Sequence, residues 1–572
     1  MSSISHTCTV FAISLAVFLC VTFPGYSLIG QQTLATSEKN MVATVHPLAT
    51  QAGLQAFEQG GNAVDAAVAA ALMLGVVDGY NSGIGGGCLM VIQTEDGNVY
   101  AIDGREMAPA AAQRDMFIRD GRVDVSLSQT GPLAVAVPGA LAAYHQVVAE
   151  HGRLEFRELL LPGAEIAEKG CELGKLYARR IAETANELRQ FDAAAAILLR
   201  ADGRPRRATD QLIQTELANT YRQIADKGLD YFYRGEFAAT VSRWMRDNGG
   251  IIDEHDFANY KTVIRAPIRS KYRDLEIVGF PPPSSGGVHV AQILNMLNHF
   301  DLATIYETDP ATFYHLLAEA MKLGFADRAH WLGDADFVDV PTGLTDEAYA
   351  RQLVEKINLA QASKVHSHGT PPDADSRFFQ KHTTHISAAD DRGNFVAITT
   401  TVNTTFGSKV IVPGTGVILN NQMDDFAIAP GTPNAFGLIG NDANSIAPGK
   451  RPLSSMSPTL VLKDGQPIMA VGAAGGPRII TQVIHAIVHY FDLNQEIDQA
   501  IAAPRIHQQW VPDRLYLENS LGQAIQLELQ RLGHETVATP VAGITQAVVF
   551  DREKKLFKGA ADPRARGTAG GQ

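Results

Sequence analysis

The sequence predicts an α+β fold in which antiparallel sheets are layered against helices. Strand-like segments come in pairs around short turns, at Asp96-Gly97, at Asp391-Arg392-Gly393 and at Asp464-Gly465. Helical patterns are grouped in blocks between these pairs instead of alternating with single strands. This order argues against a doubly wound parallel sheet, in which helices and strands alternate along the chain.

The composition is that of a globular protein with a large core. Among 572 residues, 45% are hydrophobic and 19% are charged, which excludes the disordered and collagen-like classes. The length would allow several domains, although a large layered fold can use most of it in one unit. The net charge of −13, with no offsetting basic run, argues against nucleic acid or an anionic membrane as a partner.

The N-terminal segment has the pattern of an export signal. Residues 10–21 are nearly all apolar, whereas a membrane-spanning helix needs about 20 such residues. We therefore predict a signal peptide over residues 1–27, no stable membrane span, and a periplasmic or secreted protein. Two of the four cysteines, Cys8 and Cys20, fall in this segment, so too few remain for a disulfide framework. A lipid anchor at Cys20 is disfavoured because the bulky Leu19 precedes it.

The first elements after the signal are predicted to be helices at residues 48–57 and 63–76. The second helix is apolar on nearly all sides, which is typical of a buried helix. A glycine cluster at residues 83–87 then leads into a hairpin with strands at 89–92 and 99–102. These glycines precede a strand and do not open a helix, so a dinucleotide-binding loop is a weak alternative.

The rest of the chain divides into a helical block and a strand-rich block. Residues 132–332 are predicted to be mostly helical, with a Pro- and Ser-rich loop at 281–287. Strand patterns return after Thr383. The predicted strands are 385–389, 395–402, 459–462, 468–471 and 547–550, and the helices among them are 479–490 and 523–532.

The hairpin that begins at Thr383 carries the first candidate for chemistry. If the turn is a three-residue loop with Gly393 in the left-handed conformation, Thr383 faces Thr401. A threonine hydroxyl is a weak nucleophile unless a base lies beside it, and the α-amino group of an N-terminal threonine can be that base. Such an amine requires cleavage between His382 and Thr383. Taken alone, these threonines are better explained as ordinary β-branched strand residues.

Two polar loops and one glycine turn could complete a site for an amino acid. Residues 420–426 combine amides and carboxylates, and residues 451–458 carry several hydroxyls. These groups can accept from an ammonium and donate to a carboxylate, although they are also common in ordinary loops. Residues 472–477 join a predicted strand to a predicted helix. Backbone N–H groups of Gly475 and Gly476 could stabilise an oxyanion there, or the segment could be a plain tight turn.

Together, these segments resemble the γ-glutamyltransferases, also called glutathione hydrolases, in order and in spacing. The matching motifs are residues 383–385, 401–407, 421–426, 452–458 and 475–476, together with 60–67, 104–109, 326–329 and 559–564. The resemblance therefore covers nearly the whole mature chain.

That family implies an N-terminal-nucleophile hydrolase fold, a four-layer αββα sandwich of two stacked antiparallel sheets between helices. It also implies a proenzyme that cleaves itself between His382 and Thr383. The products would be a large subunit, residues 28–382, and a small catalytic subunit, residues 383–572, which share one αββα domain. Thr383 would then take the γ-glutamyl group from glutathione or another γ-glutamyl compound and pass it to water or to an amino acid or dipeptide acceptor.

The resemblance assigns a role to each candidate residue. Arg105, Ser454 and Ser455 would bind the substrate α-carboxylate; Asn403, Gln422 and Asp425 would bind its α-ammonium; Thr401 would orient Thr383; and Gly475 and Gly476 would form the oxyanion hole. The resemblance implies no cofactor. The histidines show no metal-ligand spacing, so we expect no metal.

One departure from the family pattern and two competing interpretations remain open. Residues 433–437 resemble a lid that carries a tyrosine in some bacterial members, where this chain has Phe436. Phenylalanine has no hydroxyl to bond Asn403, so lid closure and the balance of hydrolysis to transfer are open. A glutaryl-cephalosporin acylase would share the fold and the nucleophile, but the ammonium acceptor Asp425 favours a γ-glutamyl substrate. An uncleaved secreted binding protein is the other alternative.

Overall fold

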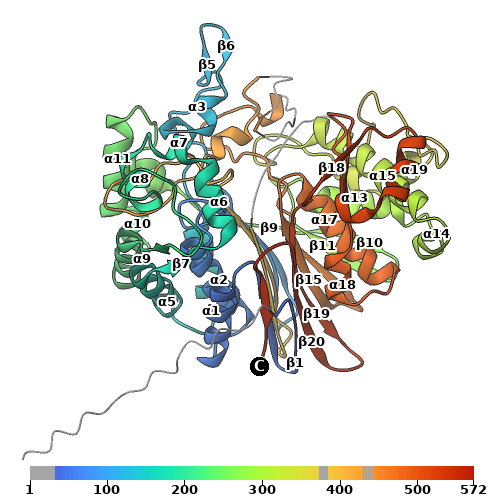
Figure 1. The fold of residues 1–572 in the computed structure, drawn as a ribbon, viewed down its shortest axis with the longest axis horizontal. Coiled ribbons are helices and arrows are strands. Elements are labelled where there is room, and N and C mark those ends of the chain that lie inside the picture. The colour runs from blue at the N-terminus through green and yellow to red at the C-terminus, as the bar shows by residue number, and fades with distance from the viewer. Residues whose placement is uncertain (1–31, 373–383, 430–433, 436–437, 439–441) are drawn as a thin grey trace, which may run out of the picture. The chain divides into compact units, whose positions relative to one another are not determined.

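Two seven-stranded sheets, stacked face to face, form the centre of the protein (Figure 1). The computed structural model describes residues 32–372, 384–429, 434–435, 438 and 442–572. Every strand pair within the two large sheets is antiparallel. The predicted layered α+β class is confirmed.

The two sheets draw their strands from both ends of the chain. In spatial order, sheet A contains β1 (Leu34–Ser37), β20 (Leu556–Ala561), β19 (Ile544–Asp551), β15 (Gln466–Ala474), β14 (Thr459–Lys463), β11 (Leu275–Gly279) and β10 (Ile268–Tyr272). Sheet B contains β21 (Thr568–Gly570), β2 (Asn40–Thr44), β12 (Thr384–Asp390), β13 (Phe395–Thr401), β3 (Gly87–Gln93), β4 (Val99–Gly104) and β9 (Val263–Arg265).

Helices cover the outer face of each sheet, which completes four layers (Figure 1). Sheet B packs against α1 (Pro47–Glu58), α2 (Ala63–Val77) and α4 (Ala140–His151). Helix α5 (Phe156–Lys169) packs on the outside of α2, and α9 (Thr215–Lys227) packs on α5. Sheet A packs against α13 (Gly286–Leu297), α17 (Arg478–Ile487) and α18 (Ile497–Ala502). Helix α15 (Pro310–Trp331) packs on α13, and α19 (Gln523–Arg531) packs on α15. Between the sheets lies a separate apolar core that includes Met41, Leu89, Val278, Ala470 and Val548.

Helix α2 is the central support of sheet B. Its first turn is closed by a capping box, in which the Asn62 side chain accepts from the Asp65 amide and Asp65 accepts from the Asn62 amide. Every residue of α2 is buried, as its all-round apolar pattern predicted. The helix packs directly on β12 and β13, the hairpin predicted to carry the nucleophile.

The two predicted subunits would be interleaved in both sheets. Sheet B takes β2, β3, β4 and β9 from the part before residue 383 and β12, β13 and β21 from the part after it. Residues 31–572 accordingly form one compact unit. The division into residues 28–382 and 383–572 stays a prediction, because His382 and Thr383 lie outside the described residues.

The predicted helical block was wrong at residues 263–279, where β9, β10 and β11 form. Strands β9 and β10 lie at sheet edges and alternate partly buried with exposed residues, so they lack the apolar run of a central strand. Strand β9 pairs with the distant β4, whereas β10 forms a hairpin with β11, which in turn joins sheet A by pairing with the distant β14. The helix predicted over residues 479–490 forms as α17, which continues directly into a π-helical segment at Val488–Asp492.

Within the described part of the chain, no helix is both long enough and apolar enough to cross a membrane. Cys88 and Cys171 are buried free thiols. The predicted signal peptide, residues 1–27, lies outside the described residues.

Candidate active site

The hairpin of β12 and β13 has the predicted register. Thr384 pairs with Thr400, and Ala389 pairs with Phe395. Gly393 adopts a φ of 95° in the turn, as a three-residue loop requires. One step further in the same register places Thr383 opposite Thr401. Thr383 itself lies outside the described residues, so this last pairing stays a prediction.

Side chains alternate along β12, which determines the direction in which Thr383 would point. Thr384 faces the helical layer, where its hydroxyl donates to the Asp78 carboxylate at 3.1 Å. Burial raises the pKa of Asp78 to about 6. His385 faces sheet A so closely that a side chain at Gly472 would collide with its ring at 2.4 Å. If the same alternation continues to position 383, which lies outside the described residues, we expect Thr383 to share the face of His385.

Thr401 and Asn403 form a rigid corner at the open end of the hairpin. The Thr401 hydroxyl is buried and accepts from the Asn403 amide at 2.8 Å. Asn403 has a φ of 79°, and its Nδ2 donates to the Asn421 carbonyl at 3.0 Å. Its Oδ1 is buried and has no hydrogen-bond partner among the described residues. The corner thus presents an acceptor without a donor.

A buried charge cluster follows the end of β4. Arg105 is fully buried; its Nη2 donates to Asp425 at 2.9 Å and its Nη1 to Glu106 at 2.6 Å. Gln422 donates to the same Asp425 oxygen at 2.5 Å. The Gln422 Oε1 is buried without a partner among the residues described. The structure therefore brings Arg105, Gln422 and Asp425 into direct contact.

The serine loop is held by an arginine that sequence reasoning did not select. Arg328 on α15 is fully buried; its Nη2 donates to the Ser455 hydroxyl at 2.6 Å, and its Nε donates to Ser285 at 2.8 Å. Ser285 in turn donates through its hydroxyl and its amide to the Ser454 carbonyl, each at 2.7 Å. Burial lowers the pKa of Arg328, and the nearby Asp425 opposes that effect. The signal for Arg328 was available, because residues 326–329 belong to the matching motifs.

Gly475 and Gly476 connect β15 to α17, where a strand-to-helix junction was predicted. Their φ angles are 136° and 66°, both in the region that favours glycine. A Cβ on Gly475 would come within 3.2 Å of Gln482 and 3.3 Å of Gly543. The preceding residue, Ala474, lines the same cavity as Thr384. The glycine turn is therefore brought to the start of β12.

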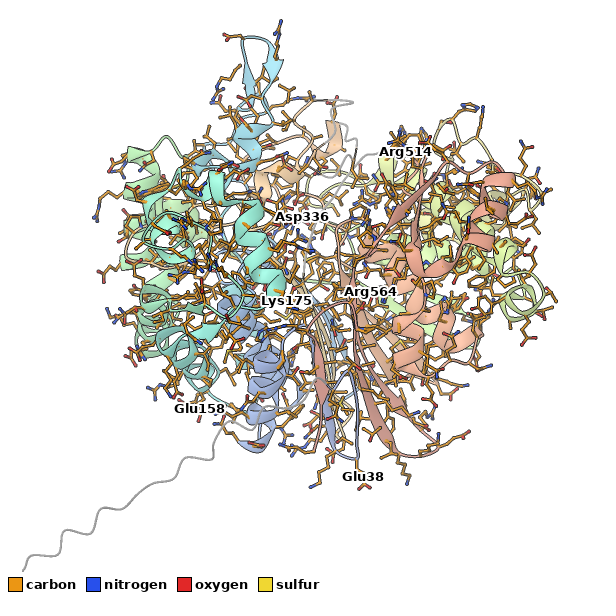
Figure 2. The ribbon with its side chains drawn as sticks, in the orientation of Figure 1. Glu38, Glu158, Lys175, Asp336, Arg514 and Arg564 are labelled. Carbon is orange, nitrogen blue, oxygen red and sulfur yellow. The ribbon has the colours of Figure 1, made fainter. Side chains whose placement is uncertain are left out.

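That cavity has a volume of about 280 Å³ and opens beside the predicted cleavage point. Asp78, Asn81 and Thr384 are among its buried and partly buried lining residues. Lys175 and Arg564, both labelled in Figure 2, also line it. The cavity provides space for a small molecule next to the start of β12.

Comparisons with known proteins agree with these observations. The family described as Gamma-glutamyltranspeptidase matches residues 49–572. The glutathione hydrolase proenzyme of Escherichia coli (strain K12) is 40% identical over 531 residues, which cover 92% of this chain and 91% of that protein. The acylase ACY 1 proenzyme of Pseudomonas sp. (strain SE83) is 38% identical over 551 residues, 93% of this chain and 94% of that protein.

A solved structure agrees as well. The crystal structure of cephalosporin acylase from Bacillus halodurans superposes with a TM-score of 0.84 at 26% identity, covering 97% of this chain and 99% of that chain. This likeness confirms the N-terminal-nucleophile hydrolase fold. With a family match that spans most of its length and a relative at 40% identity, the chain belongs to the gamma-glutamyltranspeptidase family.

Proposed function

We propose that this protein is a self-processing γ-glutamyltransferase and glutathione hydrolase with Thr383 as its nucleophile. The observation that carries the proposal is the buried contact of Arg105, Gln422 and Asp425 next to the Thr401–Asn403 corner. This group of residues offers a buried cation, a buried carboxylate and two buried acceptors that have no donor among the described residues. Together these are the groups that a zwitterionic amino-acid head requires.

Maturation starts with attack of the Thr383 hydroxyl on the carbonyl carbon of His382. The peptide C–N bond breaks as the new C–O bond forms, and the proton of the hydroxyl passes to the departing nitrogen. Water then hydrolyses the resulting ester, which releases the His382 carboxylate and leaves Thr383 with a free α-amine. Thr401, at the facing position, would hydrogen-bond the Thr383 hydroxyl and hold it in line.

The same hydroxyl then attacks the γ-carbonyl of the substrate. The α-amine of Thr383 takes the hydroxyl proton and returns it to the leaving amine, so the γ-glutamyl group is left as an ester on Thr383. The amides of Gly475 and Gly476 would stabilise the oxyanion. Water resolves the ester to glutamate, and an amino acid or dipeptide amine resolves it to a new γ-glutamyl compound.

Head-group recognition explains why Arg105 and Asp425 face each other. When no substrate is bound, Arg105 compensates the buried carboxylates of both Asp425 and Glu106. A glutamyl head would insert its carboxylate against Arg105, Ser454 and Ser455 and its ammonium against Asp425. The orphaned oxygens of Asn403 and Gln422 would accept from the same ammonium.

A glutaryl-amide acylase is the second candidate, because two of the similar proteins are named as acylases. A glutaryl group has no ammonium, so it would leave the buried oxygens of Asn403 and Gln422 without a donor. The residues around Asp425 therefore favour the γ-glutamyl substrate.

Two measurements test the proposal. Mass spectrometry and N-terminal sequencing of the purified protein should find a small fragment that starts at Thr383, and a Thr383→Ala variant should remain one chain. The mature enzyme should cleave γ-glutamyl-p-nitroanilide faster than glutaryl-p-nitroanilide. A fragment with another N-terminus would refute the nucleophile, and equal or faster turnover of the glutaryl compound would refute the substrate class.

The location and the lid belong to the proposal as well. The protein would be exported, periplasmic or secreted, after removal of residues 1–27, and sequencing of the large fragment would test this. Phe436 lies outside the described residues. The ratio of transfer to hydrolysis, measured for Phe436→Tyr and for the unchanged enzyme, would determine whether a hydroxyl at position 436 changes that ratio.

A further inference from the structure

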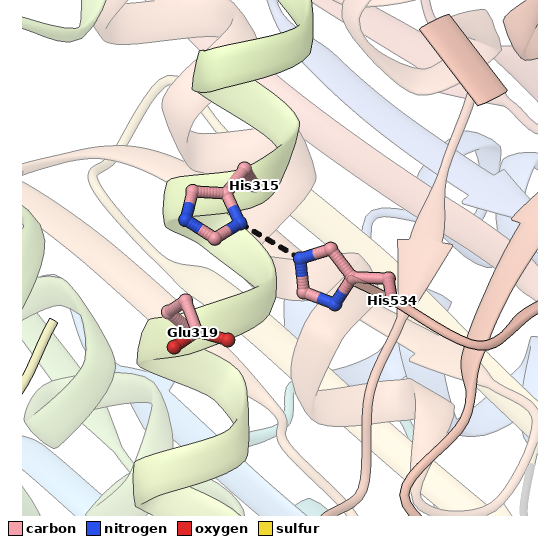
Figure 3. Close-up of side chains that lie close together, drawn as sticks. All are labelled: His315, Glu319 and His534. Atoms are coloured by element: carbon pink, nitrogen blue, oxygen red, sulfur yellow. Dashed lines mark hydrogen bonds between the residues drawn. The ribbon is translucent and has the colours of Figure 1, made fainter. Parts of the chain in front are cut away.

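Three potential metal ligands lie together on the far side of sheet A. In the part of the chain that the structure describes, His315, Glu319 and His534 form one group whose ligand atoms all lie within 4.8 Å of one another. Figure 3 shows His315 and Glu319 on successive turns of α15 and His534 reaching them from a neighbouring loop. All three residues are buried. From these observations we propose that they bind a single Zn²⁺ ion.

The donor atoms have the chemistry that zinc prefers. Two imidazoles and one carboxylate, with a water in the fourth position, form a well-known tetrahedral set. His315 and Glu319 are four residues apart on α15, so they share one face of the helix. Ligand atoms in such a set lie roughly 3.3 Å apart. The three donor atoms here lie within 4.8 Å of one another, so side-chain rotations would bring them to that spacing.

The neighbours of His315 prepare it as a ligand. Its Nε2 lies 2.8 Å from the Asn358 carbonyl, which can only accept, so the ring proton sits on Nε2. Nδ1 therefore carries a lone pair, and it lies 2.7 Å from Nε2 of His534. A backbone carbonyl that holds the remote N–H is the usual support of a zinc-bound histidine.

Glu319 supplies the negative charge. Its Oε2 accepts from the Ser363 amide at 2.8 Å, and its Oε1 has no hydrogen-bond partner among the described residues. The Lys322 ammonium lies 3.3 Å from Oε1 and competes with a cation there. Lys322 also contacts Asp513 at 3.2 Å and the Ser363 carbonyl at 2.9 Å, so it stays neutralised when Glu319 turns to the metal.

This site departs from the expectation of no metal. His315 and His534 are separated by 219 residues, and no local spacing in the sequence could reveal their contact. The ion would tie α15 to the loop between α19 and β18 (Thr536–Thr539). None of its three ligands is among the residues proposed for the catalytic site, so the inference does not depend on the enzymatic activity.

The test uses the purified, tag-free protein, dialysed against Zn²⁺ and then against buffer. We expect about one equivalent of zinc by elemental analysis, and tetrahedral d–d absorption bands when Co²⁺ replaces it. The His534→Gln variant keeps a donor for His315 but loses a ligand, so zinc should be lost. Glu319→Gln should weaken binding about tenfold or more, whereas Lys322→Gln should tighten it because a competing cation is removed.

A matched control is His489→Gln, which removes another buried histidine, one bonded to Gln495. It should keep the zinc. A chelator should lower the melting temperature of the unchanged protein and leave His534→Gln unaffected. Absence of stoichiometric zinc in the unchanged protein, or equal zinc in His534→Gln, would overturn the proposal and leave a simple histidine pair. If His534→Gln does not fold, the zinc affinities of the other two variants test the proposal. Weaker binding by Glu319→Gln and tighter binding by Lys322→Gln would support it, and unchanged affinities would overturn it.

Discussion

The two ends of the β12–β13 hairpin differ in how completely their buried polar groups are satisfied. At the turn, the Asp390 carboxylate accepts from the amides of Ala63, Arg392 and Asn394 and from the Asn394 side chain. At the open end, Asn403 has a buried oxygen with no partner among the described residues. The turn at Asp390, which we call the closed end, therefore stabilises the fold. The unpaired oxygen of Asn403 at the open end lowers the stability of the free protein, and a bound ligand that donates to this oxygen could restore it.

The largest expected effect comes from the open end. Thr383→Ala should abolish chain cleavage and lower γ-glutamyl hydrolysis by about a thousandfold or more, because no other hydroxyl would lie at that position. Gel electrophoresis and a p-nitroanilide assay measure both. Thr384→Val is the matched control on the opposite face; it should lose about 1 kcal/mol of stability and still be cleaved. Cleaved, active Thr383→Ala protein would contradict the proposal.

The charge pair at the open end gives the second effect. Asp425→Asn removes the acceptor for the ammonium, so kcat/KM for the γ-glutamyl substrate should fall about 100-fold. The ratio of γ-glutamyl to glutaryl turnover should fall with it. The neighbour Asp424 bonds Ser128 at 2.6 Å and is not placed in the head-group site. Asp424→Asn should therefore keep the ratio, and a similar drop in both variants would argue against a specific ammonium site.

The closed end should show the reverse pattern. Asp390→Ala removes an acceptor shared by several buried donors, so the free energy of unfolding should fall by about 3 kcal/mol. Activity per folded molecule should stay within about twofold, since the turn lies at the far end of the hairpin from Thr401. Urea unfolding and active-site titration separate the two quantities. If Asp390→Ala lost turnover but kept its stability, the turn would serve catalysis and not the fold, which would contradict the contrast between the two ends of the hairpin.

The smallest effect is expected at Arg328, which supports the serine loop. A lysine cannot bridge Ser285 and Ser455 as the guanidinium does, so Arg328→Lys should shift the loop slightly. We expect KM to rise about tenfold and kcat to stay within about threefold, a split that steady-state kinetics measures. Equal losses in stability and in both constants would indicate that Arg328 only supports the fold.

Much of the architecture could be predicted because it rests on local patterns. The apolar run of α2, the turn glycine Gly393 and the strand alternation around it each act within a few residues. They predicted the buried helix and the register of β12 on β13 correctly. Strands β9 and β10 could not be found in this way, because both are edge strands whose alternating exposed residues leave no apolar run. The partner of β9, β4, is also distant in the chain.

For the candidate site, the sequence by itself predicted most of the residues, since the motifs name Arg105, Asp425 and the serine loop in order, but it did not select Arg328. Only the tertiary structure decided which of them touch. It placed Arg105 on Asp425 across 320 residues of chain and brought Arg328 to Ser455. It also joined His315 to His534, which no local spacing indicates. The reason is physical: local propensity acts over a few bonds, whereas ion pairs and ligand sets depend on which strands and helices the core packs together.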